Sequence, residues 1–158
     1  GGGFIWYTYP QDTGTETVEF YLGAEASVIL NPKLYLYQDL DAYKGAYWDA
    51  SIGHGFALGE TNKLNVTLGV GLGSEGYHDG YFGGGVFIPE TDLSANFTDA
   101  RIVVDLPFHP IPFFTITPSV AWTTLIGDAK KAVEDSEEML YYGKKDAFFW
   151  GLSAKFAF

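Results

Sequence analysis

The chain has 158 residues and a net charge of −11 at pH 7, with 11 Tyr, 13 Phe, 4 Trp and 20 Gly but no Cys. This length fits one domain, and the acidic balance excludes a nucleic-acid partner, because affinity for a phosphate backbone comes largely from Lys and Arg. Without Cys there are no disulfides or thiolate metal sites, and no stretch approaches the roughly 18 consecutive apolar residues of a membrane helix.

Alternation of apolar and polar residues with a period of two predicts β-strands along the whole chain. In one of them, Leu64, Val66 and Leu68 share a face, while Asn65 and Thr67 lie on the opposite face with several Gly. Eight strands are expected, at residues 4–9, 17–28, 33–39, 46–58, 63–73, 98–106, 114–124 and 148–158.

The two faces of these strands differ in a way that is typical of a membrane barrel. Most strands have about 9 to 12 residues, the length that crosses a bilayer when tilted. In a water-soluble barrel or sandwich, the alternative interpretation, the apolar face points inward and the solvent face is rich in Lys and Glu, whereas the polar face here is small. The pattern therefore predicts an antiparallel up-and-down transmembrane β-barrel of the bacterial outer-membrane type.

The connections between strands favour the same fold. Outer-membrane barrels alternate short periplasmic turns with longer outer loops. Tight links are expected at residues 31–32, 59–62 and 107–112, and long outer loops at about 74–96 and 127–145. One domain over residues 1–158 with both termini in the periplasm follows, and the lack of a signal peptide indicates a mature form or a fragment.

Aromatic residues are expected to form two girdles at the membrane interfaces. In the predicted orientation all four Trp lie in the outer half of the barrel, and several Phe lie near the inner boundary. The girdle residues are Trp6, Trp48, Trp122, Trp150, Phe156 and Phe158.

Charged residues on the inward face are the candidates for lining a pore or filling a plug. This set is acidic overall, and it comprises Glu19, Glu25, Asp49, Asp99, Arg101, Asp105 and Lys155. In a closed eight-stranded barrel such groups pair with one another, whereas in a wider barrel they favour cations over anions. Arg101, with Asp99 and Asp105 on its own face, is the expected centre of an ion-pair cluster.

The first long outer loop supplies candidate binding residues for a ligand or a surface glycan. It combines Gly with exposed aromatics, and the candidates are Tyr77, His78, Asp79 and Tyr81. One His beside one Asp is weak support for a metal, so no metal site is predicted and a solvated loop is the favoured interpretation.

The second long loop has the pattern of a short amphipathic helix. Asp128 is a candidate N-cap, Ala129, Ala132, Val133 and Leu140 form one apolar stripe, and Gly143 suits the helix end. Its acidic residues could share divalent cations with lipopolysaccharide phosphates, although a solvated face is favoured.

Several segments together resemble a known family. The runs GGFIWYTYP, ETVEFYLGAEA, ITPSVAWTTLIGDAK and FWGLSAKFAF are similar to those of TorF-type porins and related uncharacterised bacterial outer-membrane β-barrel proteins. Members of this family have several strands before the WYTYP-like one. The resemblance implies outer-membrane residence, a pore role without catalytic residues, and a barrel of about twelve strands of which this chain supplies the last eight.

The expected function is therefore a porin-like or structural outer-membrane barrel that uses no cofactor and is not an enzyme. Its partners would be outer-membrane lipid and lipopolysaccharide, the barrel-assembly machinery, and small solutes or cations; the sequence does not fix the oligomeric state. Two alternatives stay open: an adhesin or ligand-binding protein that uses the outer loops, and a lipid-modifying enzyme. The enzyme is disfavoured because His54 and Ser51 fall on opposite faces of their strand.

Overall fold

A computed structural model describes residues 1–8, 16–82, 94–135 and 145–157. The described elements are mostly strands. In chain order they are β1 (Gly2–Tyr7), β2 (Thr17–Glu25), β3 (Lys33–Asp39), β4 (Ala46–Leu58), β5 (Asn62–Gly73), α1 (Glu75–Tyr81), β6 (Asn96–Asp105), β7 (Phe108–Ile111), β8 (Phe114–Leu125), α2 (Gly127–Asp135) and β9 (Asp146–Phe156). None of the helices in these residues is long and apolar enough to span a membrane.

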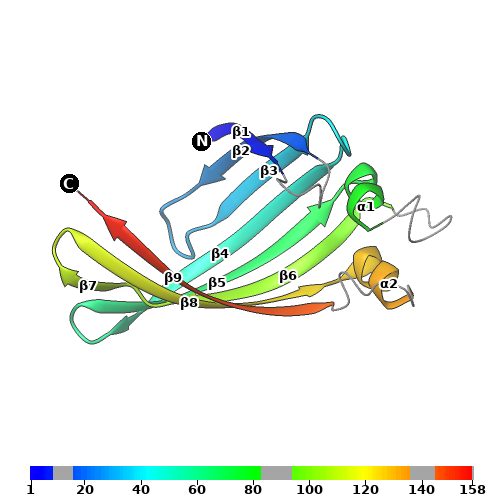
Figure 1. Ribbon diagram of the computed structural model, residues 1–158. Helices are drawn as coiled ribbons and strands as arrows, with labels where there is room; N and C mark the ends of the chain where they lie inside the picture. Colours follow the sequence, from blue (N-terminus) through cyan, green and yellow to red (C-terminus); the bar gives the residue numbers. More distant parts are fainter. Residues whose placement is uncertain (9–15, 83–93, 136–144, 158) are drawn as a thin grey trace.

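The strands form one antiparallel sheet that follows the chain. Each of β1 to β5 pairs with the next strand in the chain, β6 pairs with β8, and β9 pairs with the other side of β8. The short β7 folds back beside the beginning of β8. Figure 1 shows that the sheet curls like half of a barrel, with β1 to β3 on one side and β8 and β9 on the other.

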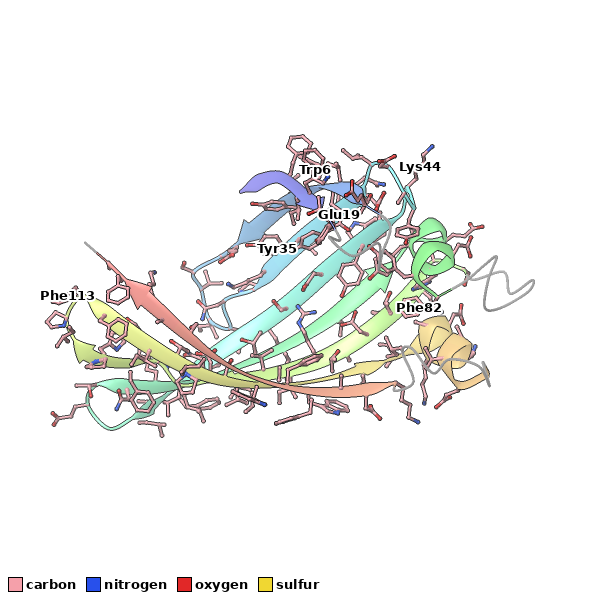
Figure 2. All side chains as sticks on the ribbon, viewed as in Figure 1. Trp6, Glu19, Tyr35, Lys44, Phe82 and Phe113 are labelled. Carbon is pink, nitrogen blue, oxygen red and sulfur yellow. The ribbon has the colours of Figure 1, made fainter. Side chains whose placement is uncertain are left out.

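The two faces of the curled sheet carry different side chains, as the alternation predicts. The outer, convex face carries large exposed apolar side chains: Phe4, Trp6, Leu22, Leu34, Trp48, Ile52, Phe56, Leu68, Val120, Trp122, Phe148, Trp150, Leu152 and Phe156. In Figure 2, Trp6 projects from the outside of the curl, whereas Glu19 lies on the inside. Phe149, on the concave side of β9, is an exposed exception.

Almost nothing apolar is buried in the described part of the chain. Only Ala46, Ala129 and Ala132 are buried apolar residues there, whereas Leu68 is 50% exposed and Trp150 is 82% exposed. A soluble sandwich would enclose such side chains between two layers. The described chain instead leaves its apolar face uncovered and turns its polar face into the concavity.

The described sheet is open, whereas the sequence led us to expect a closed barrel. Among these residues β1 pairs with β2 alone and β9 pairs with β8 alone. Alternation fixes which way each side chain points, but closure depends on strand number, tilt and register stagger together, and none of these is a local property.

Short turns and helices separate to opposite ends of the sheet. Residues 26–32, 59–61 and the β7–β8 hairpin lie at one end, and both described termini lie at that end too (Figure 1). Helices α1 and α2 lie at the other end, within the two long connections. The expected separation of the two ends is confirmed, except that residues 40–45 at the helical end form a connection no longer than residues 26–32.

Three local expectations were wrong. The segment around residue 108, expected to be only a turn, contains β7, and the loop after β5 begins with α1. Asp128 lies inside the first turn of α2 and not at its N-cap, since the helix begins at Gly127. Leu140 and Gly143, expected on this helix, lie outside the described residues.

Asp39 holds the connection between β3 and β4 through its side chain. Its Oδ1 accepts hydrogen bonds from the backbone amides of Asp41, Tyr43 and Lys44 at 2.9, 3.2 and 3.3 Å. Its Oδ2 accepts one from the hydroxyl of Thr17 at 2.8 Å. A carboxylate that accepts several amides replaces the hydrogen bonds that a tight turn otherwise leaves unmade.

We predict that Asp39→Ala lowers the free energy of unfolding by about 2–3 kcal/mol, because it leaves the buried hydroxyl of Thr17 and three part-buried amides without their acceptor. Asp39→Asn keeps one acceptor oxygen and is expected to lose less. Urea unfolding followed by tryptophan fluorescence measures both variants. Equal losses would show that the turn does not depend on these acceptors.

Candidate functional site

The concave face is built around glycines in the central strand β5. Gly69 pairs with Arg101 of β6 and Gly71 pairs with Asp49 of β4. A Cβ on Gly69 would lie 2.8 Å from the guanidinium carbon of Arg101. Because these positions carry no side chain, long polar side chains from β4 and β6 can lie across β5 and meet one another.

Arg101 is the centre of an ion-pair cluster. Its Nη2 lies 2.5 and 2.6 Å from the two carboxylate oxygens of Asp49, and its Nη1 lies 3.7 Å from Asp99. The side chains of Arg101 and Asp49 are only 24% and 21% exposed. Removing one partner from a pair this sheltered leaves the other charge uncompensated, which costs more than the pair itself contributes.

The expectation for the partners of Arg101 was only half right. Asp99 is a neighbour, but the closest carboxylate is Asp49, two strands away across Gly71, and Asp105 instead accepts a hydrogen bond from Asn65 at 2.8 Å. Asp99 can be found from the sequence, because it lies two residues from Arg101 on the same face of the same strand. Finding Asp49 requires the register of β4, β5 and β6, in which Asp49, Gly71 and Asp99 form one row.

A hydrogen bond also crosses β5 at the row formed by Asp49, Gly71 and Asp99. The hydroxyl of Tyr47 donates to Asp99 at 2.6 Å, and a Cβ on Gly71 would lie 2.1 Å from that hydroxyl. The three charged residues and Tyr47 therefore form one connected group over β5. Among the predicted lining residues, the structure brings Asp49, Asp99 and Arg101 together.

The remaining predicted lining residues lie apart from this cluster. Glu19 on β2 is 8% exposed and accepts a hydrogen bond from the hydroxyl of Tyr7 at 3.0 Å. Glu25 pairs with Lys33 at 3.1 Å and accepts a hydrogen bond from Tyr35. Lys155 is exposed on β9, opposite Thr115. Acidic groups thus outnumber basic ones along the concavity.

A polar hollow opens on the concave face near the turn end. It has a volume of about 300 Å³ and extends from the β2–β3 connection to β6. Its lining includes Glu25, Lys33, Ser51, Asn65, Thr67 and Asp105. Hydroxyl, amide and carboxylate groups together suit a ligand with many hydroxyls or a hydrated cation.

Helix α1 covers the other end of the concave face. Ser74 caps the helix by accepting the amide of Tyr77 at 3.2 Å, and it also accepts the amide of Ala46 at 2.9 Å. The backbone of Tyr77 packs directly on Gly45, where a Cβ would lie 2.3 Å from the Tyr77 nitrogen. The helix is therefore fixed to β4 at a place that only glycine fits.

His78, a candidate ligand-binding residue in the sequence, instead fixes helix α1 to the sheet in this structure. It is fully buried, its Nδ1 lies 2.8 Å from the carbonyl oxygen of Ser94, and its Nε2 lies 2.8 Å from the hydroxyl of Thr98. A carbonyl can only accept, so Nδ1 carries the proton and, in the neutral ring, Nε2 accepts from Thr98. The two hydrogen bonds thus hold α1 against β6, through Thr98, and against the segment just before it, through Ser94.

The other three loop candidates are placed differently from His78. Asp79 is exposed, and Tyr81 is 41% exposed on the same helix. Tyr77 is half-buried over Gly73, and burial raises the pKa of its phenol, with a smaller contribution from the negative charge of Asp99. The four residues thus divide into an inner pair that packs and an outer pair that faces solvent.

Helix α2 lies against β6 through Ala129 and Ala132, two residues of the expected apolar stripe. Asp128 receives hydrogen bonds from Lys131 at 3.2 Å and Ser94 at 3.0 Å, and the bond from Lys131, followed by that from Ser94, lowers the pKa of its carboxyl. Lys145 bonds Glu134 at 2.8 Å and lowers the pKa of that exposed carboxyl.

The side chains that could ligate a metal or take part in catalysis are not gathered into one site in the described residues. Within them, no group of three or more His, Asp or Glu side chains is placed to hold a metal ion. Ser51 and His54 both border the polar hollow, but the ring of His54 lies 4.8 Å from that of Phe56, which has the convex-face parity of β4. His109 lies exposed on β7.

The aromatic positions follow the expected division along the strands. Trp6, Trp48 and Trp122 lie toward the helical ends of their strands, and Phe156 stacks on Phe114 at the turn end with ring centroids 4.5 Å apart. Trp150 pairs with Val120 nearer the middle of the sheet. Phe158 lies outside the described residues.

Sequence reasoning missed one feature, a row of tyrosines on the concave face. Their positions in the alternation placed several of them among the polar residues, but only the register of the strands shows that they are neighbours. No protein-family model matches the chain, and the search of curated proteins finds no match.

We predict that Gly45→Ala loosens α1, because the added methyl group would meet the backbone of Tyr77, which cannot rotate away. A cost of about 1–3 kcal/mol corresponds to exchange of the α1 amide hydrogens that is faster by roughly 5- to 150-fold. Hydrogen exchange measured by mass spectrometry reports this change.

The matched control for this variant is Gly76→Ala, in α1 itself. The nearest atoms to a Cβ at Gly76 are 3.5 Å away, an ordinary contact. This control should leave exchange unchanged or slower, since Ala favours a helix over Gly. Equal acceleration in both variants would contradict the proposed docking of α1 on Gly45.

Proposed function

We propose that this chain forms the wall of an outer-membrane β-barrel, with lipid on the convex face and a polar lumen on the concave face. One observation carries the proposal: the large apolar side chains stand exposed on the outside of the curl, while the charged ones bond one another inside. Bilayer hydrocarbon is the surrounding that makes an uncovered apolar face of this size favourable.

The dimensions of the sheet support this role. Strands β4, β5, β6, β8 and β9 have 13, 12, 10, 12 and 11 residues, enough to cross a bilayer when tilted. Helices at one end and tight turns at the other correspond to the outer and periplasmic sides of such barrels. On this basis both described termini face the periplasm, and the Trp residues near the helical ends form the outer girdle.

A membrane cannot accept the two open edges of the described sheet, since unpaired backbone groups in hydrocarbon cost several kcal/mol each. We propose that further strands join β1 to β9 and close the barrel. The resemblance to TorF-type porins puts the total at about twelve strands. A barrel of that width leaves room between opposite walls, which favours a pore over a plugged interior.

The charge of the concave face supports a preference for cations. Arg101 and Lys33 are both paired with carboxylates, whereas Glu19 and Asp105 accept hydrogen bonds from the neutral groups of Tyr7 and Asn65. A lumen with excess carboxylates attracts cations and repels anions. We therefore propose a porin-like channel for small solutes and cations.

The lipid assignment predicts different outcomes for two adjacent residues. Leu68→Arg puts a charge on the convex face, and in a bilayer this is expected to cost about 2–4 kcal/mol near the midplane. Thr67→Arg puts the same charge on the concave face and should cost far less. Urea titration of the protein folded into phosphatidylcholine vesicles measures both, and equal costs would overturn the assignment of lipid to the convex face.

The pore assignment predicts conductance in planar bilayers with a preference for K⁺ over Cl⁻. Asp105→Asn should reduce the permeability ratio by about twofold, because it removes a lumen charge without changing its shape. Glu60→Gln, in the exposed turn after β4, is the control and should leave the ratio unchanged. A protein that inserts without conducting would overturn the pore and favour a structural barrel or a loop-based adhesin.

A further inference from the structure

Seven tyrosines form one continuous row on the concave side of the sheet, and we call it the tyrosine row. It crosses β2, β3 and β4 and continues through α1 to the β3–β4 connection. Its members are Tyr21, Tyr35, Tyr37, Tyr43, Tyr47, Tyr77 and Tyr81. Tyr35, labelled in Figure 2, lies at the end nearest the polar hollow.

Neighbouring rings of the row are in contact along its whole length. Tyr37 has ring centroids 6.1, 6.2 and 6.4 Å from those of Tyr21, Tyr35 and Tyr47. From Tyr47 the row continues to Tyr77 at 5.0 Å and then to Tyr81 at 4.5 Å. It therefore runs from the hollow at the turn end to the solvent at the helical end.

Glycine makes room for the row in the sheet. Gly23 pairs with Tyr35, and a Cβ on Gly23 would lie 2.2 Å from the Tyr35 ring. The ring consequently lies flat over the neighbouring strand and keeps part of its surface open. None of the seven tyrosines is fully buried, and the convex face of the same strands carries apolar side chains such as Leu34, Trp48 and Phe56.

The row is bordered by hydrogen-bonding groups. Tyr35 and Tyr47 donate to Glu25 and Asp99, and the hollow beyond Tyr35 adds the amide of Asn65 and the hydroxyl of Thr67. Most of these carboxylates already bond a tyrosine, Arg101 or Lys33. The row thus combines apolar ring surface with hydrogen-bond acceptors and donors, and Arg101 and Lys33 reduce the net attraction for a cationic ligand.

We propose that the tyrosine row is a binding track for a linear neutral oligosaccharide that passes along the concave face. The C–H faces of pyranose rings pack on aromatic rings, and their hydroxyls bond carboxylates and amides at the border of such a track. An anionic saccharide is disfavoured by the acidic surroundings. This inference rests on the proposed lumen and names its solute class.

The test is the block of ion current through the protein in planar bilayers by maltohexaose. Maltohexaose at millimolar concentration should interrupt the current, whereas polyethylene glycol of the same size and an oligogalacturonate should not. Tyr37→Ala should raise the half-blocking concentration by about tenfold, because it removes the ring that touches three others. Tyr37→Phe keeps the ring and should restore the block.

Two further variants separate binding from folding. Leu36→Ala changes the convex face beside Tyr37 and should leave the block as in the parent protein. Tyr81→Ala changes a half-open ring on α1, outside the strands, so its effect on the block does not depend on the sheet folding. It should raise the half-blocking concentration at least severalfold.

The outcomes distinguish the track from the pore. Conductance without a block by maltohexaose, or with an equal block by polyethylene glycol, overturns the track and leaves the pore standing. If the protein does not conduct, the pore is overturned, and calorimetric titration of the detergent-solubilised protein with maltohexaose decides the track. Binding that is lost in Tyr37→Ala and retained in Tyr37→Phe supports it, and no binding overturns it.

Discussion

The structure depends on the strict division of side chains between the two faces of an antiparallel sheet. Successive residues of a strand point in opposite directions, so one alternating sequence produces one apolar and one polar surface. In most proteins the apolar surface becomes the core. Here it stays on the outside of the curl, with Leu68 and Trp150 exposed, and the sheet itself encloses polar groups. The described chain therefore carries apolar side chains on its outer surface and polar side chains on its inner surface, the reverse of a water-soluble protein.

A polar interior has to satisfy its own charges, and glycine makes this possible. Arg101, Asp49 and Asp99 come from strands on either side of β5, and they meet because β5 has Gly69 and Gly71 beneath them. The same device lets Tyr35 lie over Gly23. Glycines on the polar face thus leave space in which long side chains from the neighbouring strands can contact one another.

The helices give one end of the concavity a fixed border. α1 is held by Gly45 beneath it and by the two hydrogen bonds of buried His78, and α2 packs on β6 through two alanines. A rigid border of this kind fixes where Tyr77 and Tyr81 lie relative to the strands. The positions of these two rings at the helical end of the concave face therefore follow from the contacts of α1.

The sequence alone determined every described strand except β7, the faces of these strands and the end at which the turns lie, because period-two alternation and turn residues are local properties of the chain. The bounds of β3 and β4 matched the expectation, and others differed by a few residues at their ends. Only the tertiary structure decided that Asp49 is the main partner of Arg101, that His78 is buried, that the tyrosines form a row, and that the described sheet is open. Each of these depends on register and curvature, which arise between segments far apart in the chain and leave no periodic mark in any one of them.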